Sequence, residues 1–149
     1  MPRIKEIYAY ARQFMEQNGN PNQWGKTNPP VEKLEEDIDR GNLYVIEEET
    51  FVHGVFAFIL GTDPTYVTIY EGCWRYEEPY GTIHRIAGDG SGGILKCCLE
   101  YCSRVIEYLR IDTHQDNHVM QNALQKAGFK RCGIILLENG SPRIAYDRK

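Results

Sequence analysis

Residues 80–109 read YGTIHRIAGDGSGGILKCCLEYCSRVIEYL, and this stretch decides the fold. An extended segment from Gly81 to Ala87 leads into a glycine-rich loop, residues 88–93, and a helix follows at once. The polar side chains of this helix recur three or four residues apart and the rest are largely apolar, which is typical of a helix on a core. Glycines let the backbone approach an anion, and the free N–H groups of a helix N-terminus point toward it. The stretch therefore indicates a phosphate site, although glycine loops also merely turn corners.

The composition is that of a globular domain. The chain has 149 residues, of which 42% are hydrophobic and 26% charged, with a net charge of −4. This charge argues against a nucleic-acid surface, no apolar stretch reaches membrane-spanning length, and the N-terminus lacks the apolar core of a signal peptide. The five cysteines are odd in number, which indicates reduced thiols. We expect a single domain over residues 1–149, in the cytoplasm, without nucleic-acid or membrane partners.

The other elements follow from hydrophobic periodicity and turn residues. We expect helices over 2–18, 31–40 and 116–127, and strands over 43–46, 52–60, 65–70, 110–114, 133–137 and 143–146. This order predicts an α/β fold of the α+β type, in which helices flank a mixed, largely antiparallel sheet. A right-handed strand–helix–strand crossover is expected only around the central helix.

A dinucleotide-binding fold is one alternative. Gly88, Gly90 and Gly93 satisfy G-x-G-x-x-G, and Asp112 follows at about the expected spacing. Such a loop should open a run of alternating strands and helices, yet here about half of the chain precedes it in hairpin order.

A metal site is a second alternative. Asp112, His114, Asp116 and His118 supply four potential ligands within seven residues. They would leave a strand and enter a helix, so their side chains need not converge, and no Cys pair or HExxH motif frames them. We expect no metal, and we expect Asp116 or Asn117 to cap the helix.

The whole order resembles the GNAT acyl-CoA N-acetyltransferases, most strongly over residues 83–147. The family's loop motif is Gln/Arg-x-x-Gly-x-Gly/Ala, and residues 90–95, GSGGIL, match it with the central glycine kept as Gly93 and both outer positions changed. Asp116-Asn117 and residues 126–129, KAGF, resemble the family's Asn after the fifth strand and its Lys-x-Gly-Phe helix end. The phrases IHRIA, DNHVMQNAL and GSPRIAYDR resemble a bacterial branch of small GNAT proteins.

The resemblance implies transfer of an acetyl group from acetyl-CoA, as cosubstrate, to a primary amine, by direct attack in a ternary complex. The loop backbone would hold the pyrophosphate, the central strand the pantetheine arm, and the N–H near Ile86 would polarise the thioester carbonyl. The implied cofactor residues are Ile86, Ala87, Gly90, Ser91, Gly92, Gly93, Ile94, Leu95 and Asn117. Leu124 stands at the position where family members often have a Tyr that protonates the leaving thiolate. Because this general acid is missing, a non-catalytic acyl-CoA-binding or sensing protein is the alternative.

Three catalytic candidates remain. Glu71 or His84 would deprotonate the amine, and Tyr146 would protonate the thiolate. Strand alternation predicts that His84 and Ile86 face one side. A surface turn for Glu71 and core positions for His84 and Tyr146 are the structural alternatives.

The acceptor is a small-molecule or peptide amine that the sequence does not identify. The aromatic residues Trp24, Tyr70 and Trp74 are candidates for its binding site, and Trp24 also suits a plug over the core. A homodimer is left open.

Overall fold

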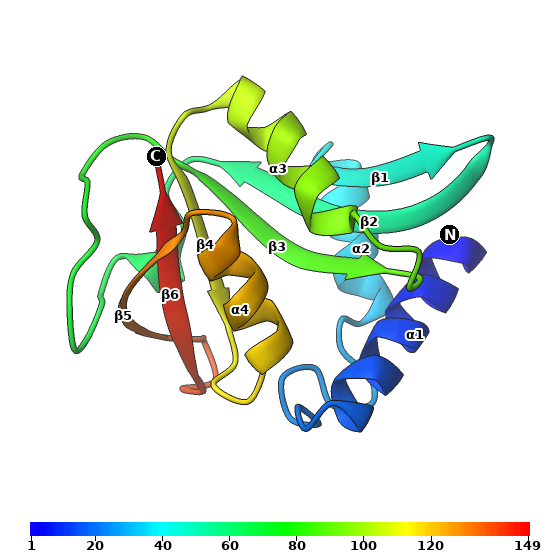
Figure 1. The fold of residues 1–149 in the computed structure, drawn as a ribbon, viewed down its shortest axis with the longest axis horizontal. Coiled ribbons are helices and arrows are strands. Elements are labelled where there is room, and N and C mark those ends of the chain that lie inside the picture. Colours follow the sequence, from blue (N-terminus) through cyan, green and yellow to red (C-terminus); the bar gives the residue numbers. More distant parts are fainter.

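The computed structural model describes residues 1–149 as a six-stranded sheet with helices on both faces (Figure 1). The helices are α1 (Pro2–Gln17), α2 (Val31–Asp39), α3 (Ile94–Val105) and α4 (His118–Lys126). The strands are β1 (Leu43–Glu48), β2 (Phe51–Leu60), β3 (Gly81–Gly88), β4 (Leu109–Thr113), β5 (Lys130–Leu136) and β6 (Pro142–Arg148). No helix combines the length and apolar composition that a bilayer-spanning segment needs.

The sheet order is β1-β2-β3-β4-β6-β5, and only β3 and β4 pair in parallel. This topology confirms the predicted mixed, largely antiparallel sheet and the crossover through α3. A second crossover, through α4, joins β4 to the parallel strand β5 across β6, so the expectation of a single crossover is wrong. The topology is incompatible with a doubly wound dinucleotide fold, whose strands run mostly parallel.

Successive side chains of β2 point into the apolar clusters on opposite faces of the sheet. Val55 packs in a cluster with Ile7, Tyr8 and Leu34 of α1 and α2. The next residue, Phe56, points the other way, into a cluster that α3 and α4 complete. A third cluster, rich in tyrosine, lies beneath the long β2–β3 connection. Both sheet faces are thus covered, as the hydrophobic alternation requires.

The predicted strand over 65–70 is wrong. Pro64–Tyr66 form a single 3-10 turn, and the Asp63 carboxylate accepts hydrogen bonds from the N–H and hydroxyl of Thr65. Only Tyr70 makes a bridge, to Ile134 of β5. The β-branched and aromatic composition suggested a strand, but an Asp cap followed by proline favours a helical turn instead.

A β-bulge interrupts β3 at Arg85. Ala57 pairs with His84 and Val55 pairs with Ala87, so two residues of β3 lie opposite one residue of β2. Arg85 takes a left-handed conformation with φ 52°. The extra residue reverses the alternation that we predicted for His84 and Ile86. Ile86 packs on the α3 and α4 side, whereas the His84 ring lies 6.1 Å from that of Tyr66 on the opposite face.

Two helices hold this bulge in place. The Tyr8 hydroxyl of α1 donates a hydrogen bond of 2.6 Å to the Arg85 carbonyl. The Arg85 guanidinium donates to both carboxylate oxygens of Asp37 of α2, at 2.8 and 3.0 Å. Asp37 is 2% exposed, so its charge depends on this bidentate partner.

Beyond the first residues of their pairing, β3 and β4 run apart, as Figure 1 shows. Their ladder comprises only Gly81 with Leu109 and Thr82 with Arg110. The bulge lies farther along β3 than this ladder, so the diverging strands leave unpaired backbone facing the gap between them. This gap sets the position of the functional site.

Replacement of Asp37 by Asn should lower the free energy of unfolding by about 3 kcal/mol, because Arg85 then lacks its carboxylate partner in a partly buried site. Urea unfolding measures this change. Asp39→Asn, at the exposed end of the same helix, is the control and should change stability by less than about 0.5 kcal/mol. Equal effects of the two substitutions would show that the ion pair does not hold the bulge.

Candidate functional site

Two cavities meet where β3 and β4 diverge. One, of about 260 Å³, lies between the α1–α2 loop and the sheet and is called the polar cavity below. The other, of about 380 Å³, lies between α1, the glycine loop and α4 and is called the apolar cavity. Met15, Ile86, Asn117 and Met120 line both. Ligands in the two cavities would therefore come together beside the bulge.

The apolar cavity collects most of the predicted cofactor residues. Its lining includes Ile86, Ala87, Gly90, Gly92, Ile94, Leu95 and Asn117. Ser91 and Gly93 belong to the same loop but do not line the cavity. The opposite wall comes from α1, through Tyr10 and Phe14, which are 43% and 41% exposed.

The glycine loop presents free backbone donors. Gly90, Gly92 and Gly93 have φ values of 91°, 87° and 74°, which favour glycine. Gly93 is the N-cap of α3 and offers no side-chain cap. The N–H groups from Gly92 to Leu95 have no acceptor within the protein. Because a Cβ on Gly92 or Gly93 would meet no atom within 4 Å, this backbone is open to a ligand. Such a loop suits a phosphate.

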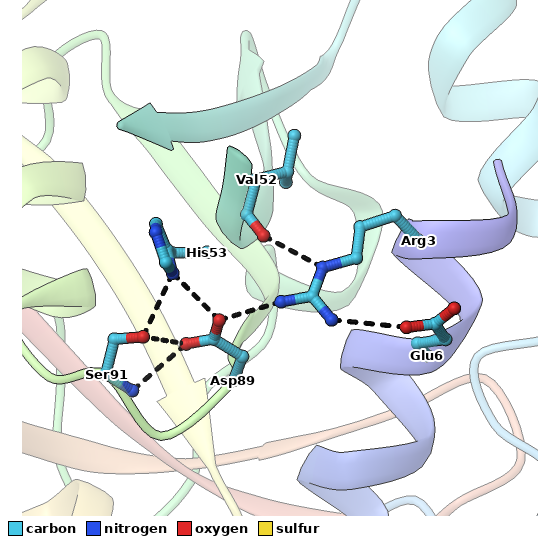
Figure 2. Close-up of polar contacts among 6 residues, drawn as sticks. All are labelled: Arg3, Glu6, Val52, His53, Asp89 and Ser91. Carbon is cyan, nitrogen blue, oxygen red and sulfur yellow. Dashed lines mark hydrogen bonds and ion pairs between the residues drawn. The ribbon is translucent and has the colours of Figure 1, made fainter. Parts of the chain in front are cut away.

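Asp89 anchors the loop to the rest of the protein (Figure 2). Its carboxylate accepts from Arg3 of α1 at 2.8 Å and from the N–H of Ser91 at 3.0 Å, and it lies 2.8 Å from Nδ1 of His53. The Arg3 side chain also donates to the carbonyl of Val52. Burial alone would raise the pKa of Asp89, but hydrogen bonds from Ser91 and His53 outweigh it and lower this pKa to about 2.

His84 is the predicted base that reaches the polar cavity. Its Nε2 lies 2.7 Å from a carboxylate oxygen of Asp63. Burial opposes ionisation of Asp63, but hydrogen bonds from His84 and Thr65 lower its pKa to about 2. Trp24 lines the same cavity and packs edge-on against Tyr8, with ring centroids 5.6 Å apart. Trp24 thus combines the cavity wall and the core plug that the sequence left open.

Asn117 serves as the helix cap that the sequence predicts. Its Oδ1 accepts from the N–H of Met120 at 3.0 Å, and its Nδ2 donates to Oε1 of Gln23 at 2.9 Å. Gln23 comes from the α1–α2 loop and lines the polar cavity, so this contact ties that loop to the start of α4. Asn117 therefore positions the cavity wall as well as the start of α4.

Four predicted site residues lie outside both cavities. Glu71, with φ 57°, and Tyr70 are in the exposed β2–β3 connection. Trp74 packs on that connection, where its indole N–H donates to the Tyr66 carbonyl at 2.9 Å. Tyr146 is 6% exposed and packs on the α3 and α4 side of the sheet, the face opposite to His84. The structure does not bring these residues together with His84.

Sequence reasoning missed Gln23, Asp63 and Arg143. Each reaches the site from a loop or a distant strand, and no local pattern identifies it. The α1 sequence does carry a signal: the spacing of Ile7, Ala11 and Phe14 puts Phe14 on the face that packs on the sheet, yet only Ile7, Tyr8 and Ala11 are buried. The part of that face that stays exposed, with Phe14, lines the apolar cavity.

The potential metal ligands do not converge. Asp112 accepts a hydrogen bond of 2.7 Å from Tyr66, and Nδ1 of His114 accepts the N–H of Asp116 at 3.0 Å. No group of three or more His, Cys, Asp or Glu side chains is placed to hold a metal ion.

Replacement of Asp89 by Asn should lower Tm by about 2–4 °C, or about 1 kcal/mol, and speed amide exchange in residues 90–93. Because the pKa of Asp89 is depressed, its carboxylate stabilises the folded state at pH values above the pKa of the unfolded chain, near 3.9. This stabilisation is lost as the pH falls toward 2, the pKa in the folded state. The difference from wild type should therefore shrink below about pH 4. The control Glu6→Gln removes an exposed partner of the same Arg3 and should have little effect. If amide exchange in residues 90–93 of Asp89→Asn is as slow as in the wild type, Asp89 does not anchor the loop.

Comparison with known proteins places this geometry in a family. The chain is similar to a GNAT-family acetyltransferase from Streptococcus agalactiae, with 31% identity over 99% of this chain and 90% of that one, and a TM-score of 0.81. A putative acetyltransferase from Staphylococcus aureus has 21% identity over 99% and 91% of the two chains, with a TM-score of 0.70. The NatC complex bound to Gag peptide and CoA shares the fold at 12% identity over 99% and 93%, with a TM-score of 0.58.

Neither a protein-family model nor a curated protein sequence matches the chain. The 31% identity to the Streptococcus agalactiae acetyltransferase extends over nearly the whole of both chains. The chain therefore belongs to the GNAT family of acetyltransferases.

Proposed function

We propose that this protein transfers an acetyl group from acetyl-CoA to a primary amine by direct attack in a ternary complex. The observation that carries the proposal is the meeting of the two cavities at Ile86, between β3 and β4. An apolar cavity that ends in free loop amides suits a long ligand with a phosphate group. A polar cavity with a histidine suits the amine. Direct transfer requires both ligands at one point.

The residues of the apolar cavity fit coenzyme A. The free N–H groups of Gly92 to Leu95 would bind the pyrophosphate, and the α3 N-terminus adds a favourable dipole. The pantetheine amides would pair with the exposed backbone of β3 near Ile86 and Ala87, much as an added strand does. The CoA present in the NatC structure supports this assignment by shared fold.

His84 is the proposed base. In the tautomer that donates Nε2–H to Asp63, Nδ1 carries the lone pair and takes a proton from the ammonium, directly or through one water. The neutral nitrogen then attacks the thioester carbon, the N–C bond forms, and the C–S bond breaks. The N–H of Ile86 would stabilise the charge that develops on the carbonyl oxygen.

The thiolate has no evident side-chain acid. Leu124, at the family's usual Tyr position, is fully buried, and Tyr146 lines neither cavity. We therefore propose that water protonates the leaving thiolate. This gap also favours the second candidate, a non-catalytic acyl-CoA-binding protein. Thiol release from acetyl-CoA with a panel of amines separates the two, because a binding protein would bind CoA and release no thiol.

Gly93→Asp should weaken CoA binding at least tenfold, or by about 1.4 kcal/mol, because it adds charge and bulk at the proposed phosphate site. Calorimetry measures the affinity. Gly140→Asp is the matched control, since Gly140 also has a positive φ, 82°, and open space around it, but lies in the β5–β6 turn. If both variants bind CoA as the wild type does, the phosphates lie elsewhere.

His84→Gln should lower kcat/KM for the amine at least tenfold at neutral pH, because glutamine keeps a polar side chain but cannot accept the proton. The wild-type rate should rise with pH as the base and the amine lose their protons, and the variant should require a higher pH. Glu71→Gln is the comparison, because Glu71 lies outside both cavities. A loss of activity in Glu71→Gln alone would assign the base to Glu71 instead.

A further inference from the structure

The polar cavity contains a buried cation that lacks an ion pair. Arg143 of β6 is 6% exposed. Its guanidinium donates to Oγ of Ser141 at 2.7 Å and to the carbonyls of Pro142 at 2.8 Å and Gln23 at 3.1 Å, all of them neutral acceptors. No carboxylate lies within 4.0 Å of it. Burial lowers the pKa of Arg143, and the charge of Asp112, which lies beyond ion-pair distance, acts in the opposite direction.

Asp112 of β4 is the corresponding anion. It lines the same cavity, and its only bonded partner is the Tyr66 hydroxyl, at 2.7 Å. Burial raises the pKa of Tyr66 well above its usual range, so the phenol keeps its proton and donates it to the Asp112 carboxylate. No arginine or lysine lies within ion-pair distance of Asp112.

These two groups and His84 share one face of the sheet. The β4–β6 register pairs Asp112 with Ala145, so Arg143 is the diagonal neighbour of Asp112, with Cα atoms about 7–8 Å apart. The β3–β4 register pairs Thr82 with Arg110, which puts His84 on the same face as Asp112. The proposed base, an anion and a cation thus follow one another across β3, β4 and β6.

The remaining charges of the cavity are already compensated. The Arg85 guanidinium is bound by Asp37, and His84 by Asp63. Lys33 pairs with Glu36 at 3.6 Å, and its side chain is 40% exposed at the rim. Asp112 and Arg143 therefore remain without an ion pair, with only a longer-range attraction between them, and together they complement a ligand with one charge of each sign.

We propose that the acceptor is a small zwitterion, an amine that also carries a carboxylate, as a free amino acid does. The carboxylate binds Arg143, and Asp112 attracts the ammonium toward His84. This inference rests on the proposed function, because it names the acceptor class of the same reaction.

The number of N–H donors that Arg143 has left favours a carboxylate as its partner. Arg143 has five N–H donors and uses three in the bonds above, so five minus three leaves two, which match the two oxygens of a carboxylate. The cavity of about 260 Å³ lies below the range of about 300–1,000 Å³ that is common for drug-sized ligands, which favours a small acceptor.

The test compares matched acceptors in a thiol-release assay with acetyl-CoA. The standard L-amino acids are assayed beside their carboxamides, which keep the amine and the side chain but lack the carboxylate. For the preferred amino acid we expect a kcat/KM at least tenfold above that of its carboxamide. A carboxamide that reacts as well as its parent amino acid would overturn the inference and leave the proposed acetyl transfer standing. If neither class releases thiol while another amine of the panel does, the inference fails and the proposed function stands. If no amine of the panel releases thiol, both fail.

Arg143→Gln gives a second measurement. The variant should lose the preference for the carboxylate while its KM for acetyl-CoA stays unchanged, because Arg143 does not line the apolar cavity. If Arg143→Gln does not fold, Arg143→Lys keeps the charge but not the paired donors, and it should keep part of the preference. A variant that folds and retains the full preference would contradict the role of Arg143. The wild-type comparison needs neither variant.

Discussion

The site depends on one residue held in a left-handed conformation. A non-glycine residue in this region costs roughly 1–3 kcal/mol and persists only where its surroundings enforce it. Here the carboxylate of Asp37 holds the Arg85 side chain and the hydroxyl of Tyr8 holds its carbonyl, so both N-terminal helices contribute. The resulting bulge lies on the strand that diverges from β4 after two paired residues, which is where the two cavities meet.

The two sides of this meeting point differ in their electrostatics. On the glycine-loop side, free backbone N–H groups face a mostly apolar cavity, and the one acidic side chain in the loop, Asp89, is compensated by Arg3 and by the hydrogen bonds of His53 and Ser91. On the other side, His84, Asp112 and Arg143 line a polar cavity. Under the proposed function, an anionic ligand would bind on the first side and an amine on the second, and the two would meet beside Ile86. This separation suits a reaction of two substrates bound at once.

Much of the fold was predictable because its signals are local. The central strand, glycine loop and helix, the flanking helices and both hairpins follow from periodicity, glycines and caps. The strand over 65–70 failed because the Asp63–Pro64 pair starts a helical turn despite a β-like composition. The bulge was not predictable, since one extra residue reverses strand alternation and leaves no trace in the composition. For this reason the sequence placed Ile86 and His84 on the same face of the sheet, whereas they lie on opposite faces. Tyr146 lies on the other face of the sheet and Trp74 in the β2–β3 connection, while Asp63 reaches His84, and Arg143 the cavity, only through tertiary packing.

The most direct test of the central claim is a crystal structure of the protein with acetyl-CoA bound. We expect the pyrophosphate within hydrogen-bond distance of the N–H groups of Gly92 to Leu95, the pantetheine arm between β3 and β4, and the thioester carbonyl beside the N–H of Ile86. The bulge at Arg85 should be unchanged, because the protein alone already holds it. Acetyl-CoA bound outside the gap between β3 and β4, or a bulge that straightens on binding, would contradict the claim.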